Sequence, residues 1–260
     1  MCTLIVLHRC FEAAPLVVAA NRDEDLRRSA EGPALRDTAH GRVVAPRDLR
    51  AGGTWLGLNR HGLFAAITNR RCESPDPNRR SRGLIVLDAL TAASASEAAD
   101  EIETLQTDTY NPFNLLLADA RTAHVFSYVG KPERIDLSPG AHVIGNLHPR
   151  DTTSPKVARQ QREVAAIAAG PVDGVLDALA SVCRSHAGEG PMENTCVHAE
   201  PEPYGTCSST LLRQGPDTSE LRYADGAPCV REYTDFTHLL SELDRESPRA
   251  EGPTSARKVS

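Results

Sequence analysis

The chain has 260 residues, of which 40% are hydrophobic, 25% are charged and only 4% are aromatic. This composition is ordinary for a soluble globular protein, and the length suffices for a sizeable core. The formal net charge of −6 and the few aromatic residues argue against a general role in binding nucleic acid. No apolar run approaches the roughly 20 residues of a membrane span, and no signal-peptide pattern is present, so a cytoplasmic location is expected.

The first predicted strand is the apolar, β-branched run at residues 3–8, which directly follows Cys2. A turn separates it from a second apolar run at 16–20, and the polar sequence Asn-Arg-Asp-Glu follows at 21–24. Tight pairing of the two strands would return this polar cluster to the neighbourhood of Cys2. We therefore interpret the two features together.

Cys2 would carry both a thiol and a free α-amine if Met1 were removed. The thiolate is the nucleophilic form of cysteine, and an α-amine, with a reference pKa of about 7.7–8.0, can accept a proton near neutrality. N-terminal nucleophiles that use their own amine as base are a known variant of the nucleophile–base arrangement. A small apolar residue at the start of a buried strand is the alternative interpretation of Cys2.

The seven cysteines are odd in number and irregularly spaced, without a Cys-x-x-Cys motif, so a disulfide framework is not expected. Cys183 with His186, and Cys196 with His198, together offer the ligand types of a four-ligand zinc site. Structural zinc sites usually contain closer cysteine or histidine pairs, so we expect no bound metal.

The next stretch, residues 25–48, is charged and predicted to be a loop with one short strand at 42–45. Residues 52–68 contain two apolar runs around an Asn-x-x-Gly turn, which predicts a β-hairpin ending at Asn69. The apolar residues 83–93 predict a helix. Ser94 and Glu97 have the spacing of a capping box, which predicts a second helix to about residue 105.

The second half of the chain repeats this succession of strands and helices. The predicted strands lie at residues 113–118, 123–128, 134–137 and 141–145, the last directly before Asn146. Ser154 and Pro155 predict the start of a helix to about residue 169. The remaining predicted elements are a helix at 172–186, a loop at 187–203, strands at 208–213 and 221–224, and a short helix at 236–243.

Blocks of strands that alternate with blocks of helices favour two stacked antiparallel sheets covered by helices. We therefore predict an α+β fold, a four-layer α-β-β-α sandwich, formed by a single domain of residues 1–244. The polar residues 245–260 are predicted to be a disordered tail.

Several short motifs occur along this predicted domain. They are Met-Cys-Thr at 1–3, Ala-Asn-Arg-Asp-Glu at 20–24, Gly-Thr-Trp-Leu-Gly at 53–57, Ala-Ile-Thr-Asn at 66–69, Gly-Asn at 145–146, Ser-Pro-Lys-Val at 154–157 and Tyr-Gly-Thr at 204–206. Together they resemble the NRDE family, which is the family of the Transport and Golgi organisation protein. This family is grouped by resemblance with the N-terminal nucleophile (Ntn) hydrolases.

The resemblance implies the sandwich fold of bile salt hydrolases and penicillin V acylases, in which a cysteine at position 2 attacks an amide after loss of the initiator methionine. It implies that Asp23 orients the amine of Cys2. Arg22 and Asn21 stand in the neighbourhood of a supporting arginine and asparagine, in an order that allows their roles to be exchanged.

The resemblance further implies that Asn69 and Asn146 serve the oxyanion and the amine. An amide N–H can stabilise a developing oxyanion without bringing a proton to lose. One position departs from the family pattern, because Cys207 follows Tyr-Gly-Thr where an arginine is often found. The arginines considered as substitutes are Arg70, Arg71 and Arg222.

Two main functions remain open at this point. The first is an amidohydrolase that uses Cys2 on a small non-peptide amide without a cofactor. The second, implied by family members linked to haem trafficking and lipid metabolism, is a non-catalytic carrier of haem or an acyl lipid in the same pocket. A third hypothesis is a scaffold that acts through protein contacts.

Overall fold

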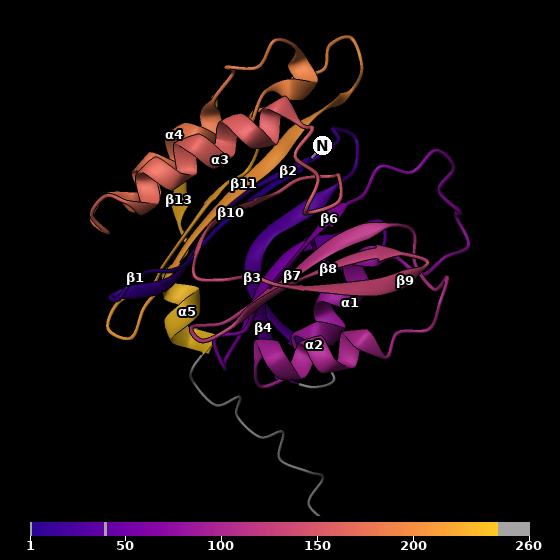
Figure 1. Ribbon diagram of the computed structural model, residues 1–260, viewed down its shortest axis with the longest axis horizontal. Coiled ribbons are helices and arrows are strands. Elements are labelled where there is room, and N and C mark those ends of the chain that lie inside the picture. Colours follow the sequence, from indigo (N-terminus) through magenta and orange to yellow (C-terminus); the bar gives the residue numbers. More distant parts are fainter. Residues whose placement is uncertain (1, 39–40, 244–260) are drawn as a thin grey trace, which may run out of the picture.

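The computed structural model describes residues 2–38 and 41–243. Two β-sheets are stacked face to face, and helices cover both outer sides (Figure 1). One sheet has six strands in the order β10-β1-β2-β11-β12-β13, and the other has seven in the order β3-β4-β5-β6-β7-β8-β9. All neighbouring strands are antiparallel. The predicted fold class, an α+β sandwich of two antiparallel sheets, is confirmed.

The six-stranded sheet consists of β1 (Thr3–Phe11), β2 (Ala14–Asp25), β10 (Gly140–Ile144), β11 (Tyr204–Gln214), β12 (Glu220–Ala224) and β13 (Thr234–Asp235). The seven-stranded sheet consists of β3 (Ala30–Thr38), β4 (Gly41–Asp48), β5 (Leu56–Asn59), β6 (Phe64–Asn69), β7 (Phe113–Ala118), β8 (Ala123–Val129) and β9 (Lys131–Asp136). The helices are α1 (Arg82–Ala89), α2 (Ala95–Glu103), α3 (Pro155–Ala168), α4 (Val175–Arg184) and α5 (His238–Leu243), with a short 3-10 turn at Pro191–Glu193.

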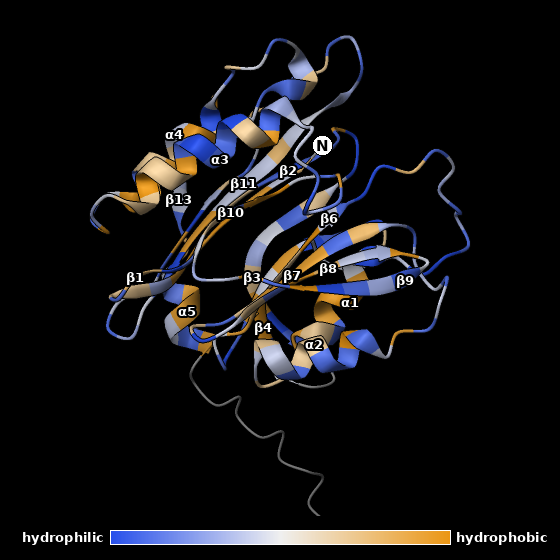
Figure 2. Ribbon diagram, in the orientation of Figure 1, coloured by the Kyte–Doolittle hydropathy of each residue, from blue (hydrophilic) through white to orange (hydrophobic). Residues whose placement is uncertain are grey.

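Strands β1 and β2 are buried on both faces, because successive side chains of a strand point to opposite sides of the sheet. Leu4 and Val18 belong to the core between the two sheets, whereas Ile5 and Val17 pack with residues of α3 and α4. A strand buried on both faces needs an uninterrupted apolar run, and the sequence provides one in each strand. Figure 2 shows these hydrophobic strand segments between the helical layers.

The predicted helix starts are confirmed at two places. The Oγ of Ser94 accepts a hydrogen bond from the backbone N–H of Glu97 at 3.2 Å, at the start of α2. The Oγ of Ser154 accepts one from the N–H of Val157 at 3.3 Å, with Pro155 at the first position of α3. These side chains satisfy N–H groups that lack partners within the helix.

The prediction of a loop over most of residues 25–48 is wrong, since β3 and β4 occupy this stretch. Strand β3 lies at the edge of its sheet, and its charged residues include Glu31 and Arg36, which form an ion pair at 3.1 Å. Charged side chains are common on edge strands, where they oppose pairing with another chain. Because of these charged residues, β3 lacks the apolar run by which the buried strands were predicted.

The core between the sheets extends to the end of the described chain, because α5 contributes Leu239, Leu240 and Leu243 to it. The predicted disordered tail at 245–260 lies outside the described residues. Within the described ranges, no helix combines the length and apolar character needed to cross a membrane.

Gly53 and Gly83 pack backbone against backbone. At this contact the N–H of Thr54 donates to the carbonyl of Gly83 at 3.0 Å. A Cβ on Gly53 would overlap the backbone of Gly83, which cannot rotate away. We expect Gly53→Ala to lower the free energy of unfolding by about 1–3 kcal/mol in urea denaturation.

Gly190→Ala is the matched control, because a Cβ there meets no atom within 4 Å. Its expected effect is below about 0.5 kcal/mol. Similar losses of stability in the two variants would contradict the close packing of Gly53 on Gly83.

Candidate active site

The pairing of β1, β2 and β11 brings Cys2 to the polar cluster. Strand β1 pairs with β2 as far as Asn21, and Asp23 pairs with Thr206 of β11. Cys2 immediately precedes β1, and its Sγ donates to the backbone oxygen of Asp23 at 3.6 Å. The polar cluster was predicted to follow the strand, but it lies within β2, because β11 extends the pairing to Asp25.

The carboxylate of Asp23 is buried at the side of the sheet that faces α3. Its Oδ1 accepts a hydrogen bond from the hydroxyl of Thr206 at 2.7 Å, and its Oδ2 lies 4.0 Å from the Nζ of Lys156. Burial raises the pKa of Asp23 and lowers the pKa of Lys156, because each charged form loses its hydration. The charge of each partner opposes the change in the other.

Lys156 was not predicted as a site residue. It lies in the first turn of α3, within the motif at 154–157 that contributes to the family resemblance. Thr206 was missed in the same way, within the motif at 204–206. The two motifs were the sequence signal that could have identified these side chains as site candidates, although their contact with Asp23 is a property of the fold.

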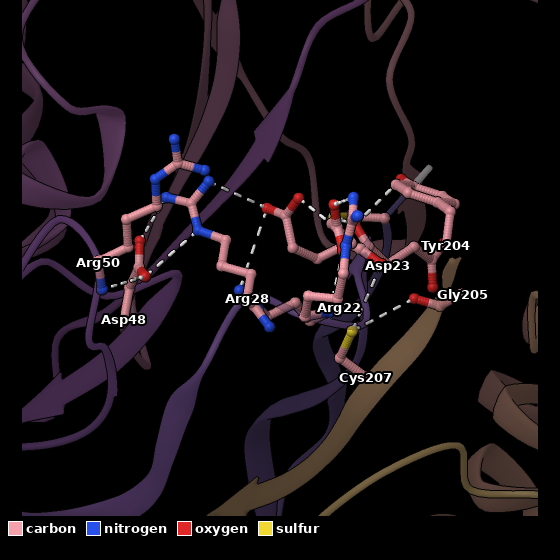
Figure 3. Close-up of polar contacts among 12 residues, drawn as sticks. Arg22, Asp23, Arg28, Asp48, Arg50, Tyr204, Gly205 and Cys207 are labelled. Carbon is pink, nitrogen blue, oxygen red and sulfur yellow. Dashed lines mark hydrogen bonds and ion pairs between the residues drawn. The ribbon is translucent and has the colours of Figure 1, made fainter. Parts of the chain in front are cut away.

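Arg22 points to the opposite side from Asp23, into the space between the sheets. Its guanidinium carbon lies 4.5 Å from the ring centroid of Trp55, and its side chain is largely buried. Its Nη2 is 4.0 Å from Oε2 of Glu24, which also lies 3.5 Å from Arg28. Figure 3 shows this chain of charges continuing from Arg28 to Asp48, which are paired at 2.5 Å.

The structure does not bring the side chain of Asn21 to Cys2. The amide Nδ2 of Asn21 donates to the backbone oxygens of Cys183 at 2.9 Å and Thr195 at 3.0 Å. These bonds hold the C-terminal end of α4 and the segment around Thr195 against the sheet. The side chain of Asn21 therefore anchors this part of the chain to β2.

Asn69 and Asn146 each line a cavity that Cys2 also lines. Asn69 ends β6 and lines one cavity with Cys2, while Asn146 follows β10 and lines a second cavity of about 230 Å³ with the same cysteine. The Nδ2 of Asn146 donates to the backbone oxygen of Asn69. The buried Oδ1 of Asn146 has no hydrogen-bond partner in the part of the chain that the structure describes, so it can accept a hydrogen bond from an incoming N–H group.

The cavity that Cys2 shares with Asn69 has a volume of about 360 Å³ and a charged wall. Its arginines are Arg22, Arg28, Arg50, Arg79, Arg80 and Arg82. Its carboxylates are Asp23, Glu24, Asp48 and Asp76. Arg28, Arg79 and Arg80 form ion pairs with Asp48, Asp108 and Asp88. Among the described residues Arg82 forms no such pair, so its charge is available to a ligand that carries negative charge.

Cys207 borders a different cavity of about 400 Å³. Its Sγ lies at a bulge of β11 and donates to the backbone oxygen of Glu24 at 3.5 Å (Figure 3). The hydroxyl of Tyr204 donates to the backbone oxygen of Asp23 at 3.0 Å nearby. Burial raises the pKa of the Cys207 thiol.

Three arginines were considered from the sequence as substitutes for the arginine that is absent at position 207. The structure gives two of them partners elsewhere, and only Arg71 shares a cavity wall with Cys2. Arg70 donates to the hydroxyl of Ser127 at 2.7 Å, and Arg222 pairs with Asp177 at 2.6 Å. Arg71 lines the cavity that holds Asn146. The arginines that share a cavity wall with both Cys2 and Asn69 include Arg22 and Arg82.

Arg82 is the first residue of α1, and its Nη1 donates to the backbone oxygen of Pro112 at 3.0 Å. Burial lowers the pKa of Arg82, while the negative charges of Glu24 and of a Cys2 thiolate act in the opposite direction. Arg82 and Cys2 line the same cavity. This arginine offers the site a positive charge that Cys207 does not supply.

The overall architecture is that of the N-terminal nucleophile hydrolases. An N-acylethanolamine-hydrolyzing acid amidase ortholog from Caenorhabditis elegans superposes with a TM-score of 0.58 at 11% identity, covering 88% of this chain and 94% of that chain. A C2A mutant of conjugated bile acid hydrolase from Clostridium perfringens gives a TM-score of 0.53 at 11% identity, covering 95% of each chain. At this identity, the similarity establishes the fold alone.

The family model of Transport and Golgi organisation 2 matches residues 1–222, and the chain belongs to this family. The human Transport and Golgi organization protein 2 homolog is 34% identical over 141 residues, and the mouse homolog is 33% identical over 141 residues. Each match covers 50% of this chain and 50% of the relative, so the chain spans about half the length of these curated relatives. The family resemblance predicted from the motifs is confirmed.

The surroundings of Cys2 predict how its reactivity depends on pH. Burial raises the pKa of the Cys2 thiol, and the negative charge of Asp23 raises it further. Alkylation of Cys2 by iodoacetamide, followed by peptide mass spectrometry, should therefore have a midpoint above the value of about 8.5 for an ordinary thiol.

Asp23→Asn removes a negative charge and should move this midpoint to lower pH. Asp177→Asn, at an exposed carboxylate paired with Arg222, is the control and should leave it unchanged. An unchanged midpoint in Asp23→Asn would show that Asp23 does not act on the thiol.

Proposed function

We propose that this protein is an Ntn-type amidohydrolase that uses Cys2, after removal of Met1, to cleave a small non-peptide amide. The observation that carries the proposal is the position of Cys2 at a cavity wall, in contact with the backbone of Asp23, whose carboxylate is buried. Two proteins that share the fold are described as an acid amidase ortholog and a conjugated bile acid hydrolase. Their reaction class supports the proposal.

In the proposed reaction, the α-amine of Cys2 takes the thiol proton and the thiolate attacks the amide carbonyl carbon. The carbonyl electron pair moves to oxygen, where the side-chain N–H group of Asn69 stabilises the oxyanion. The amine then returns the proton to the leaving nitrogen as the C–N bond breaks, which leaves a thioester on Cys2. Attack of water on the thioester releases the acid and restores the thiol.

Asp23 and Asn146 hold the amine in this scheme. The buried carboxylate of Asp23 accepts a hydrogen bond from the protonated amine and stabilises its charge. The Oδ1 of Asn146, buried beside Cys2, accepts another. In the neutral amine, two acceptors that take its two N–H groups would leave the lone pair for the thiol proton.

The charged wall of the cavity narrows the proposed substrate to an amide that also carries an anionic group. Arg22 and Arg82 lie in the same wall as Cys2, and arginine binds carboxylate and phosphate groups through paired hydrogen bonds. The proposed setting is the cytoplasm, where thiols stay reduced. All seven cysteines are free thiols.

The mature N-terminus tests the proposal directly. Intact mass spectrometry of the protein made in cells should show the loss of one methionine. A β-lactone or electrophilic amide probe should label Cys2, and labelling should persist in Cys207→Ala and disappear in Cys2→Ala. A retained methionine would overturn the proposed mechanism.

Asn69→Ala removes the proposed oxyanion donor while Cys2 and Asp23 remain in place. Loss of one such donor lowers turnover by about 10²–10³-fold in other hydrolases. With an anionic amide that the protein hydrolyses, we expect a loss of kcat in this range. Asn111→Ala, in the same cavity wall but on another segment, is the control. Equal rates in the two variants would remove Asn69 from the mechanism.

The alternative proposal is a non-catalytic carrier that holds haem or an acyl lipid in this cavity. The arginine-rich wall favours it as well, because guanidinium groups pair with propionates and with anionic headgroups. A cysteine thiolate can also ligate haem iron. A haem titration should then shift the Soret band, and Cys2→Ala should change the shifted position. A titration without any shift would contradict haem carriage.

A further inference from the structure

A second group of reactive side chains lies outside the cavity of Cys2. The ligand atoms of His186, Cys196, His198 and Cys229 all lie within 4.8 Å of one another. Three separate segments supply them: the residues after α4, the stretch that precedes β11 and the loop after β12. Side chains that can bind a metal thus converge from distant parts of the chain.

The distances within this group are close to those of a tetrahedral metal site. The Sγ of Cys196 lies 3.4 Å from the Sγ of Cys229 and 3.7 Å from Nε2 of His198. The same Nε2 lies 3.1 Å from the Sγ of Cys229. Zinc–sulfur bonds of about 2.3 Å and zinc–nitrogen bonds of about 2.0–2.1 Å put tetrahedral ligands roughly 3.3–3.8 Å apart.

The fourth side chain completes the set without packing into the core. The ring centroid of His186 lies 5.3 Å from that of His198, and the two ring planes meet at 83°. His186 and His198 are exposed, Cys229 is partly buried and Cys196 is fully buried. The group therefore lies at the surface, where an ion can enter.

We propose that His186, Cys196, His198 and Cys229 bind one Zn²⁺ ion in a tetrahedral Cys₂His₂ site. Two thiolates balance the charge of the ion, and two neutral imidazoles complete its coordination. A set of four protein ligands leaves no position for substrate, which is the arrangement of structural zinc sites. The site holds the loop after β12 to the segment before β11.

This proposal replaces the expectation of no metal and changes the ligand set considered from the sequence. Cys183 is fully buried in the core between α4 and the six-stranded sheet, and it is not a member of the group. Cys229 takes its place, because β12 runs antiparallel to β11 and returns the chain toward the start of β11. Cys229 and His198 are 31 residues apart in the sequence, so the sequence alone did not indicate that they are partners.

The residues next to Cys196 connect the proposed zinc site to the candidate active site. The backbone oxygen of Thr195 accepts a hydrogen bond from Asn21, and the N–H of Val197 donates to the hydroxyl of Thr206 at 2.8 Å. The same hydroxyl donates to Asp23. A bound ion would therefore stabilise the segment that holds this carboxylate in place.

Metal analysis of the full chain, purified without chelators, tests the site. We expect one equivalent of zinc, or stoichiometric uptake of added Zn²⁺. Uptake of Co²⁺ should produce the visible absorption of tetrahedral cobalt with thiolate ligands. His186→Ala and Cys229→Ser should each weaken zinc binding by more than about 100-fold, because even residues that only support a ligand affect affinity by about 10–100-fold.

Cys72→Ser is the matched control, because Cys72 is an exposed thiol outside the group and should leave zinc binding unchanged. His186 is exposed, so His186→Ala should fold even if Cys229→Ser does not. Chelation should lower the Tm of the wild-type protein and of Cys72→Ser, but not that of His186→Ala.

Two results would overturn the proposal. One is reduced, metal-free protein that fails to bind added Zn²⁺, or that binds it equally well in His186→Ala and Cys229→Ser. The other is a disulfide between Cys196 and Cys229, visible as the loss of two hydrogens in the intact mass of the protein kept under reducing conditions like those of the cytosol. Neither readout depends on the activity of Cys2.

Discussion

The pairing of β2 with β1 on one side and with β11 on the other positions the groups of the candidate site. Because side chains alternate along a strand, this register points Arg22 between the sheets and Asp23 toward α3. A slip of one residue would exchange the two and place a guanidinium beside Lys156. Apolar residues of β2 face both sides of the sheet, so what opposes such a slip is the loss of the buried hydrogen bonds made by Asn21 and Asp23.

The sequence was sufficient for the parts of the site that depend on neighbouring elements. Cys2 and the polar cluster lie on consecutive strands of one hairpin, so an estimate of strand pairing already brought them together. The helix caps at Ser94 and Ser154 were readable because they are local. Strand β3 was missed because its charges belong to an exposed edge, where the apolar pattern that identifies buried strands is absent.

The contacts that could not be predicted join segments far apart in the sequence. Lys156 is a residue in the first turn of a helix, and only packing of α3 on the sheet reveals that it faces Asp23. Arg82 follows a charged loop in the sequence, and it lines the cavity only because of where α1 packs in the fold. Asn21 was expected at the site from its motif, but its side chain points to Cys183 and Thr195 instead. A motif gives the position of a residue but not the direction of its side chain. The convergence of Cys229 with His198 has the same origin.

Arg22 borders both the cavity beside Cys2 and the cavity beside Cys207, and its guanidinium rests on the ring of Trp55. Arg28 borders both cavities as well, so two arginines separate the two chambers. In the proposed hydrolase, the length of the ligand would then be limited by these two side chains, separately from the chemistry at Cys2 and Asp23.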